Sequence, residues 1–288
     1  MKDEKTNSYQ AFEYKPKEYW EERLTRDFSL GGVGYLGLGR IYNSYLYRLR
    51  VAAADRAIQR WKIDVRGKSV LDVGCGTGFW LEYWSRRGAA ELSGVDIADV
   101  AISRLSQRFP DAKLYCDDIS NPSFSLPTQF DIVSAFDVLF HITDDEKWSL
   151  ALGNIARHLK PGGWLLLSDL FLRGRELVGM HQVSRTLSLY LEQLTTIGFE
   201  YLGRLPIFVL AHPPIDEQNK WRRKLLEAFW ATQVKAIYLA RRLKIEPFVA
   251  HPLGGLIVFA DLVATRLCRE GPSTELMVAR KKTSCNGP

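Results

Sequence analysis

Between about residues 67 and 170, short apolar runs alternate with amphipathic segments, and this alternation constrains the fold more than any other feature of the chain. The apolar runs include "SVLDV" at 69–73 and "WLLLSDL" at 164–170. Segments with helical periodicity separate them, such as "DEKWSLALGNIARHLK" at 145–160. Strands that alternate with helices of this length form a parallel sheet with helices on both faces. The sequence therefore predicts a Rossmann-like, doubly wound α/β fold.

The same pattern predicts secondary structure along the rest of the chain. Strands are expected at 69–73, 91–97, 112–118, 130–140, 164–170, 200–212 and 273–282, and helices at 16–30, 40–62, 78–88, 99–109, 145–160 and 181–199. Residues 1–62 are expected to hold a mobile tail, to about residue 15, and a helical lid. Residues 63–288 then form the main domain, with a largely helical insertion at about 214–270 that we expect to cap the ligand edge of the sheet.

Composition narrows the class of protein. The chain carries 39 Lys and Arg against 33 Asp and Glu, a net charge of +6, which permits contact with phosphates or acidic lipids without requiring it. Its four cysteines, Cys75, Cys116, Cys268 and Cys285, lack disulfide or zinc-ligand spacing, which favours a reducing cytosol. The start of the chain lacks the apolar core of a signal peptide, and the longest apolar run, at 253–267, is too short to span a membrane. We therefore expect a soluble, cytoplasmic protein.

Two glycine clusters compete for the role of a cofactor loop. The first, Gly32, Gly34 and Gly37, spells G-x-G-x-x-G. A dinucleotide-binding loop of that pattern needs a strand before it and a helix after it. The preceding "LTRDFS", at 24–29, makes a poor strand. This cluster is therefore interpreted as a hinge or lid between two helices, with a direct role in closing over cofactor or substrate as the alternative.

The second cluster, Gly74, Gly76 and Gly78, directly follows a predicted strand and opens a helix, whose first N–H groups are unpaired. Asp96 lies 18 residues past Gly78 at the end of the next strand, where a carboxylate can bind two ribose hydroxyls. An acid, Asp72, precedes the loop and would repel a pyrophosphate. The second cluster therefore predicts a site for an adenosyl ligand with a cationic end rather than for NAD.

Five ordered motifs carry a family resemblance. They are "VLDVGCGTGFW" (70–80), "SGVDI" (93–97), "CDDIS" (116–120), "FDIVSAFDVLFHI" (130–142) and "LKPGGWLLLSD" (159–169). In this order they resemble the motifs of class I S-adenosylmethionine-dependent methyltransferases, over about residues 65–170 and more loosely at the last two strands. The resemblance implies a seven-stranded sheet whose last strand is antiparallel, S-adenosylmethionine as the cofactor, and methyl transfer as the reaction.

The resemblance also assigns residues to the methionine and ribose parts of the cofactor. Asp72 would lie beneath the methionine end and order the loop or a water there. Gly74, Gly76 and Gly78 would let the backbone approach without a Cβ in the way. Asp96 would bind the ribose hydroxyls.

The adenine and amino ends receive the remaining assignments. Ile97 would pack against the adenine, and the Phe136 carbonyl would lie near the amino group of the cofactor. Asp118 and the Ile119 amide would meet the adenine edge, with Asp117 as an alternative carboxylate and a solvated turn as the alternative for both acids. Cys75 is expected to be a small residue of the glycine loop rather than a nucleophile.

A hydroxyl acceptor would need a general base, whereas an amine or an acidic phenol can react without one. Three side chains are candidates for this base. His141 is the first, since its unperturbed pKa lies near neutral and its loop borders the methyl group. Asp137 and Asp169 follow. For His141 the alternative is a histidine that only binds the loop backbone, and for Asp137 it is a structural acid behind the fourth strand.

The acceptor is expected to be a small molecule, a sugar or a lipid-linked compound, with O-methylation favoured over N- or C-methylation. No nucleic-acid acceptor is expected, because "FDVL" at 136–139 replaces the N/D-P-P-aromatic motif, and "HPPID" at 212–216 follows a much later strand. An aminopropyl transferase is less favoured, because the chain shows no acid-rich polyamine gate. The alternative outside catalysis is a silent cofactor-binding module that acts through a partner.

The insertion contains a basic amphipathic segment at 219–244. Such a helix can lie on an anionic membrane, cover an apolar acceptor site, or pack on the sheet with a solvated basic face. The oligomeric state is not predicted.

Overall fold

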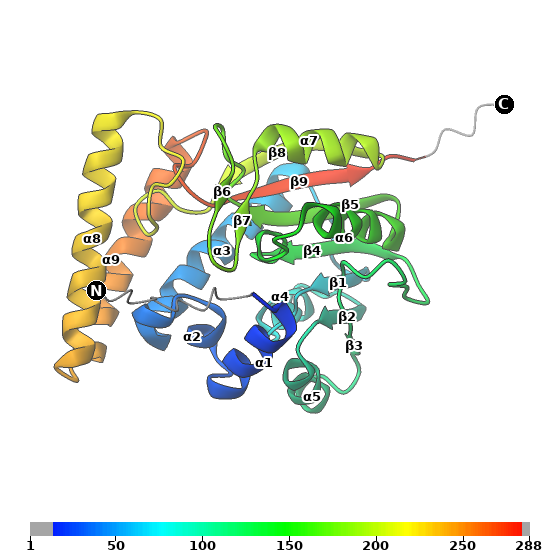
Figure 1. The fold of residues 1–288 in the computed structure, drawn as a ribbon, viewed down its shortest axis with the longest axis horizontal. Coiled ribbons are helices and arrows are strands. Elements are labelled where there is room, and N and C mark those ends of the chain that lie inside the picture. Colours follow the sequence, from blue (N-terminus) through cyan, green and yellow to red (C-terminus); the bar gives the residue numbers. More distant parts are fainter. Residues whose placement is uncertain (1–13, 284–288) are drawn as a thin grey trace, which may run out of the picture.

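The computed structural model describes residues 14–283. Most of the predicted tail and Cys285 lie outside these residues. The chain forms a central sheet of seven strands with helices on both faces (Figure 1). The strands are β1 (Ser69–Val73), β2 (Glu91–Asp96), β3 (Lys113–Cys116), β4 (Phe130–Phe136), β5 (Leu159–Asp169), β8 (Phe199–Pro206) and β9 (Glu275–Lys281).

The strand order is β3-β2-β1-β4-β5-β9-β8. Strands β1 to β5 pair in parallel, and β9 pairs antiparallel with both β5 and β8. This confirms the predicted doubly wound sheet with its antiparallel last strand. Because neighbouring parallel strands end at one edge, the segments that follow β1, β2 and β4 meet there.

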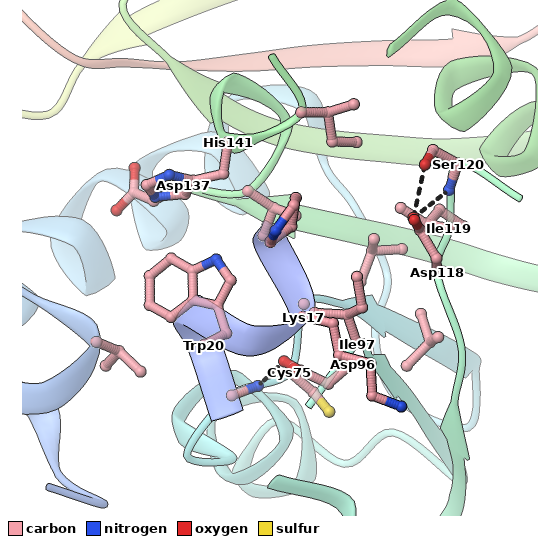
Figure 2. A pocket seen from close by; sticks show the side chains of 18 of the residues that line it. Lys17, Trp20, Cys75, Asp96, Ile97, Asp118, Ile119, Ser120, Asp137 and His141 are labelled. Carbon is pink, nitrogen blue, oxygen red and sulfur yellow. Dashed lines mark hydrogen bonds between the residues drawn. The ribbon is translucent and has the colours of Figure 1, made fainter. Parts of the chain in front are cut away.

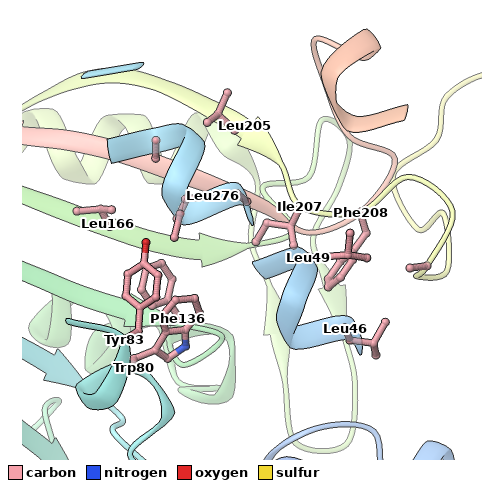
Figure 3. Close-up of a cluster of buried hydrophobic side chains, with 14 of the residues drawn as sticks. Leu46, Leu49, Trp80, Tyr83, Phe136, Leu166, Leu205, Ile207, Phe208 and Leu276 are labelled. Atoms are coloured by element: carbon pink, nitrogen blue, oxygen red, sulfur yellow. The ribbon is translucent and has the colours of Figure 1, made fainter. Parts of the chain in front are cut away.

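Helices of the two faces bury separate apolar clusters. One face is covered by α3 (Gly39–Trp61), α4 (Phe79–Arg86) and α5 (Asp99–Arg108), and the other by α6 (Asp145–His158) and α7 (Leu187–Thr196). Figure 3 shows the larger cluster, in which Leu46 and Leu49 of α3 lie close to Phe208 and Ile207, which follow β8. Burying a side chain as completely as Leu46 is buried stabilises the fold by about 1.5–3 kcal/mol.

The N-terminal part contains α1 (Pro16–Arg26), α2 (Leu30–Val33), the short 3-10 helix η1 (Leu36–Leu38) and then α3. The insertion forms an antiparallel hairpin of α8 (Lys220–Arg242) and α9 (Glu246–Leu267) at one end of the molecule (Figure 1). Helix α9 packs against α3. The predicted helices in both regions are therefore present, although α1 ends earlier than expected.

Several boundaries differ from the prediction. The strands expected at 130–140 and 200–212 end earlier, at Phe136 and Pro206, and β5 begins at Leu159, within the helix expected at 145–160. The helix expected at 181–199 begins only at Leu187, because the Thr186 hydroxyl accepts from the Leu189 N–H and caps it. The residues before it form a hairpin of β6 (Leu177–Val178) and β7 (Val183–Ser184).

Helix α9 also differs. It begins at Glu246, well before the apolar run at 253–267, and is 22 residues long. By length and composition it could therefore cross a membrane, contrary to the estimate from the run alone.

Candidate functional site

A cavity of about 600 Å³ opens at the carboxyl ends of β1, β2 and β4, a volume within the usual range for small-molecule sites. It brings together most of the residues expected to form the site. Those that line it are Gly74, Cys75, Gly76, Asp96, Ile97, Asp117, Asp118, Ile119, Phe136, Asp137 and His141. In Figure 2, His141 and Asp137 lie toward one end of the pocket and Asp118, Ile119 and Ser120 toward the other.

The glycine loop is fixed by backbone hydrogen bonds. Gly74 and Gly76 have φ values of 68° and 48°, a region in which only glycine is unstrained. The N–H groups of Gly74 and Cys75 donate to the Val95 carbonyl, at 2.7 and 3.1 Å. The loop therefore lies directly against the end of β2, which carries Asp96.

Asp96 is held by two backbone donors. The Gly76 N–H donates to Oδ2 at 2.8 Å and the Ala98 N–H donates to Oδ1 at 2.9 Å. Burial raises the pKa of this carboxyl above its usual value. A carboxylate oxygen can accept more than one hydrogen bond, so Asp96 can still bind a pair of hydroxyls on a ligand in the cavity.

The end of the cavity opposite His141 is lined by both apolar and acidic side chains. Ile97 and Ile119 supply apolar wall on either side of the acids. Asp118 Oδ1 accepts from the Ser120 N–H and hydroxyl, at 2.8 and 2.7 Å, and Asp117 Oδ1 accepts from the Asp118 N–H at 2.7 Å. Both acids line the cavity and each has an oxygen left over, so the choice between them for the adenine edge stays open.

His141 lies at the other end, on the 3-10 helix η2 (Leu139–His141). Its Nδ1 is 3.0 Å from the His181 carbonyl oxygen. Because a carbonyl can only accept, Nδ1 must carry the proton, and Nε2 keeps a lone pair. Burial lowers the pKa of His141 to about 4, so the ring is neutral at pH 7. The His141 ring also packs between two other rings. Its centroid is 4.9 Å from that of Trp20, which is edge-on, and 5.4 Å from that of His181, which is stacked on it.

Asp137 lines the same end but is already paired. The Arg50 Nε donates to Oδ2 at 2.5 Å and the Ser168 hydroxyl donates to Oδ1 at 2.8 Å. Its φ of 58° is a left-handed conformation that costs energy for any residue but glycine. The Asp137 N–H donates to the Ser168 hydroxyl oxygen at 2.9 Å, which holds that conformation. This arrangement suits the structural alternative for Asp137 better than a base.

Asp169 does not line the cavity, which corrects its assignment as a candidate base. It is buried at the end of β5, where it accepts from the Tyr190 hydroxyl at 2.5 Å and from the Leu170 N–H at 2.6 Å. Burial raises the pKa of this carboxyl to about 7. The side chain therefore belongs to the contact between the sheet and α7.

Asp72 and Gly78 also lie outside the cavity wall. Asp72 accepts from the Ser134 hydroxyl at 2.7 Å, and its Oδ2 has no partner within residues 14–283. Burial raises the pKa of Asp72 to about 7. Gly78 caps α4 with a φ of 76°, and a Cβ there would lie 2.5 Å from Leu105 Cδ2. Both residues therefore support the loop from behind.

A family model for a methyltransferase domain matches residues 44–202, more than half of the chain. The chain belongs to this methyltransferase domain family. The matched span includes β1 to β5, the glycine loop and every predicted site residue.

Curated relatives match part of this methyltransferase domain. A ubiquinone biosynthesis O-methyltransferase from Neisseria meningitidis serogroup C (strain 053442) is 33% identical over 112 residues, which cover 37% of this chain and 46% of that protein. A ubiquinone biosynthesis O-methyltransferase from Coxiella burnetii (strain Dugway 5J108-111) is 31% identical over 148 residues, which cover 50% of this chain and 55% of that protein. The chain thus spans about half the length of the curated relatives it matches.

Solved structures support the fold. The N-methyltransferase NodS from Bradyrhizobium japonicum WM9, in complex with S-adenosyl-l-homocysteine, has a TM-score of 0.50 and 14% identity over 91% of this chain and 98% of its own. The [4+2]-cyclase SpnF has a TM-score of 0.50 and 22% identity over 82% of this chain and 81% of its own. Since one of these is named a methyltransferase and the other a cyclase, the fold hosts more than one chemistry.

Helix α1, which precedes the matched span, lies over the cavity, although the sequence did not indicate which of its residues line it. Lys17 and Trp20 line the cavity and lie in front of the strand ends in Figure 2. The Lys17 ammonium pairs with Asp99 at 2.9 Å, and the Glu21 carboxylate accepts from the Val100 N–H at 3.2 Å. No local pattern marks Lys17 and Trp20, because their place depends on packing against α5.

The first glycine cluster spans α2 and η1, between α1 and α3. Gly32, Gly34 and Gly37 lack space for a Cβ, which would meet Asp27, Asn43 and Tyr238 respectively. The short helix α2 has four residues and follows no strand, as the sequence context predicted.

The insertion was expected to cap the ligand edge, but none of its residues lines the cavity. Its helices pack on α3 and η1. His212 of the "HPPID" stretch is buried between Tyr35 and Ser273, with its Nε2 2.6 Å from the Tyr35 hydroxyl. Within residues 14–283, no three His, Cys, Asp or Glu side chains gather as metal ligands would.

Proposed function

We propose that the chain is an S-adenosylmethionine-dependent methyltransferase that transfers a methyl group to a hydroxyl of a small-molecule acceptor. The observation that carries this proposal is a neutral His141 with an available Nε2 in the same cavity as Asp96. The names of the curated relatives, which are O-methyltransferases of ubiquinone biosynthesis, support a hydroxyl as the acceptor group.

The cavity fits the cofactor by the chemistry of its walls. Asp96 presents a carboxylate for vicinal hydroxyls, and the glycine loop admits a ligand close to the backbone. Ile97 and Ile119 can enclose a planar base, while Asp117 or Asp118 accepts from its exocyclic amine. When bound, S-adenosylmethionine supplies a methyl group already activated by its positive sulfur.

His141 can accept the proton that the acceptor hydroxyl loses. A hydroxyl oxygen that takes a methyl group becomes positively charged, so that its proton turns strongly acidic. Nε2 of His141 can accept that proton even though the pKa of this ring is about 4. The Nδ1–H bond to the His181 carbonyl fixes the tautomer and the direction of the ring.

Aromatic side chains support an acceptor with an apolar ring. Trp20 of α1, Tyr47 of α3, and Phe79 and Trp80 of α4 line the cavity with Phe136. Trp80 lies 4.1 Å from Phe136 between ring centroids, and Tyr47 lies 4.6 Å from Phe79. Such walls exclude water from the reacting groups and favour an acceptor with a ring or another flat apolar part over a polar sugar.

The test is transfer of labelled methyl from S-adenosylmethionine into separate pools of phenols, aliphatic alcohols and amines. We expect label in a hydroxyl compound, with wild-type cofactor binding and lost transfer in His141→Ala. Label found only in amines would replace O-methylation by N-methylation. Cofactor binding without label in any pool or in a host extract would favour the silent binding module.

A further inference from the structure

The positive charge of the chain is concentrated on the α8–α9 hairpin. Residues 220–267 contain nine Lys and Arg against three Asp and Glu, a net charge of +6. The whole chain also has a net charge of +6, so the remaining residues are balanced. All nine basic side chains are exposed. Within residues 14–283, six of them form no ion pair: Lys220, Lys224, Lys235, Arg242, Lys244 and Arg266.

Helix α9 carries an uncovered apolar stripe between these charges. The stripe consists of Phe248, Pro252, Leu256, Phe259, Val263 and Leu267. Spacings of three and four residues place them on one face of the helix. Phe248, Phe259 and Leu267 are 81%, 70% and 80% exposed, values that core residues never show. At 1.5 Å per residue the stripe is about 28 Å long.

The opposite face of α9 is fixed to the protein. Ala250, Ile257 and Asp261 are buried there. The Asp261 carboxylate accepts from the N–H groups of Val209, Leu210 and Ala211, at 2.8 to 3.1 Å. To cross a bilayer, α9 would have to break these bonds and leave α3, so it can meet a membrane only from the side.

We propose that the α8–α9 hairpin docks the protein on the surface of an anionic lipid bilayer, with α9 lying in the membrane plane. The apolar stripe would enter the boundary between headgroups and acyl chains. Basic residues stand at both ends of the stripe, with Arg242 and Lys244 before Phe248, and Arg266 beside Leu267. Arg222 of α8 reaches the same end, since its guanidinium lies 3.3 Å from Cys268 Sγ.

Charge favours lipid over a second copy of this chain. A symmetric dimer through this face would oppose two hairpins, each of net charge +6, and like charges in contact oppose association. An anionic surface attracts the same residues, and each basic side chain near it strengthens binding several-fold.

The test is co-sedimentation of the full chain with vesicles of equal parts phosphatidylcholine and phosphatidylglycerol, and with vesicles of phosphatidylcholine alone. We expect binding to the mixed vesicles that weakens as salt rises, and much weaker binding to the neutral ones. Replacing two stripe residues, Leu256→Ser with Phe259→Ser, should lower the partition coefficient at least about tenfold. Lys235→Glu with Arg242→Glu should reduce binding only to the mixed vesicles.

The matched control is Val178→Ser with Met180→Ser, which removes two apolar side chains of similar exposure from the β6–β7 hairpin. It should bind vesicles as the wild type does. Unchanged cofactor binding in every variant shows that the fold is intact. The proposal is overturned if the wild type ignores anionic vesicles, or if the stripe substitution instead dissociates a dimer that forms without lipid.

Discussion

The two ends of the cavity are built in different ways. At the end where we propose that the nucleoside binds, most of the predicted site residues lie at or just after a strand end, and backbone N–H groups hold the Asp96 carboxylate. At the acceptor end, the walls are side chains from α1, α3, α4 and η2, which lie far apart in the sequence. A ligand common to a family can be recognised by local backbone geometry, whereas a variable acceptor is recognised by packing.

His141 tests the acceptor end and should give the largest effect. His141→Ala removes the proton acceptor and should lower kcat by about 10²–10⁴-fold, with the cofactor Kd unchanged within about twofold. Single-turnover kinetics and calorimetry measure the two quantities. His251→Ala, an exposed histidine on α9, is the control. Equal losses in kcat and in cofactor binding would mean that the two ends do not act separately.

The pH dependence of wild-type activity also tests whether His141 is the proton acceptor. The pKa of His141 is lowered to about 4 by burial, so its neutral form persists well below the usual 6.5. At saturating cofactor, so that protonation of Asp96, whose pKa burial raises, does not limit binding, kcat should therefore fall only as pH drops through about 4. An acid limb near 6.5 would show that His141 is not the base.

Asp96 tests the nucleoside end. Asp96→Ala should weaken cofactor binding by about 1–3 kcal/mol, because ligand hydroxyls and two backbone donors lose their acceptor. Asp111→Ala, an exposed acid beyond α5, should bind normally. Unchanged cofactor affinity in Asp96→Ala would remove the adenosyl site from this end of the cavity.

The two glycine clusters give a matched pair of substitutions. Gly74→Ala places a Cβ at a φ of 68° and 2.4 Å from Val138 Cγ2, and should cost about 1–3 kcal/mol of unfolding free energy and impair cofactor binding. Gly37→Ala meets only the hydroxyl end of the half-exposed Tyr238, which can move away. Urea unfolding with cofactor titration compares them, and a larger loss of cofactor binding in Gly37→Ala would reverse the assignment of the loops.

Asp169 lies outside both ends and should affect stability rather than turnover. Its folded pKa of about 7 exceeds the unfolded value, so its contribution to stability is complete at low pH and is lost as pH rises toward 7. Asp169→Asn removes this titration. The difference in unfolding free energy between pH 5.5 and pH 8 should therefore differ by about 1–2 kcal/mol between this variant and the wild type. Methyl transfer should stay within about threefold of the wild type, while a loss comparable to that of His141→Ala would restore Asp169 as a base.

The sheet, and the gathering of residues at the proposed nucleoside end, could be predicted because their signals are local. The strand, glycine turn and helix around Gly74, and the acid at the end of the next strand, are adjacent in sequence and in space. Trp20 and Lys17 could not be predicted, since their contacts with the cavity depend on how α1 packs on α5.

The error at Asp169 has a geometric cause. Successive strand residues point to opposite faces of a sheet, and the sequence does not tell which face the last residue takes. Ser168 points toward Asp137 and the cavity, so Asp169 points toward Tyr190 on the other face. Asp72 is a different case, because it points to the same face as Ser168 but is bonded to Ser134 inside the layer between the sheet and α4.

Helix α1 imposes an order on the events of one turnover. It is held over the cavity by side-chain contacts, with Lys17 on Asp99 and the Arg23 guanidinium on the Gly32 and Gly34 carbonyls. We expect a nucleoside ligand bound behind Lys17 and Trp20 to exchange only after these contacts open. Steady-state kinetics should then be sequential, with the demethylated cofactor leaving last and competing with fresh cofactor for the free enzyme.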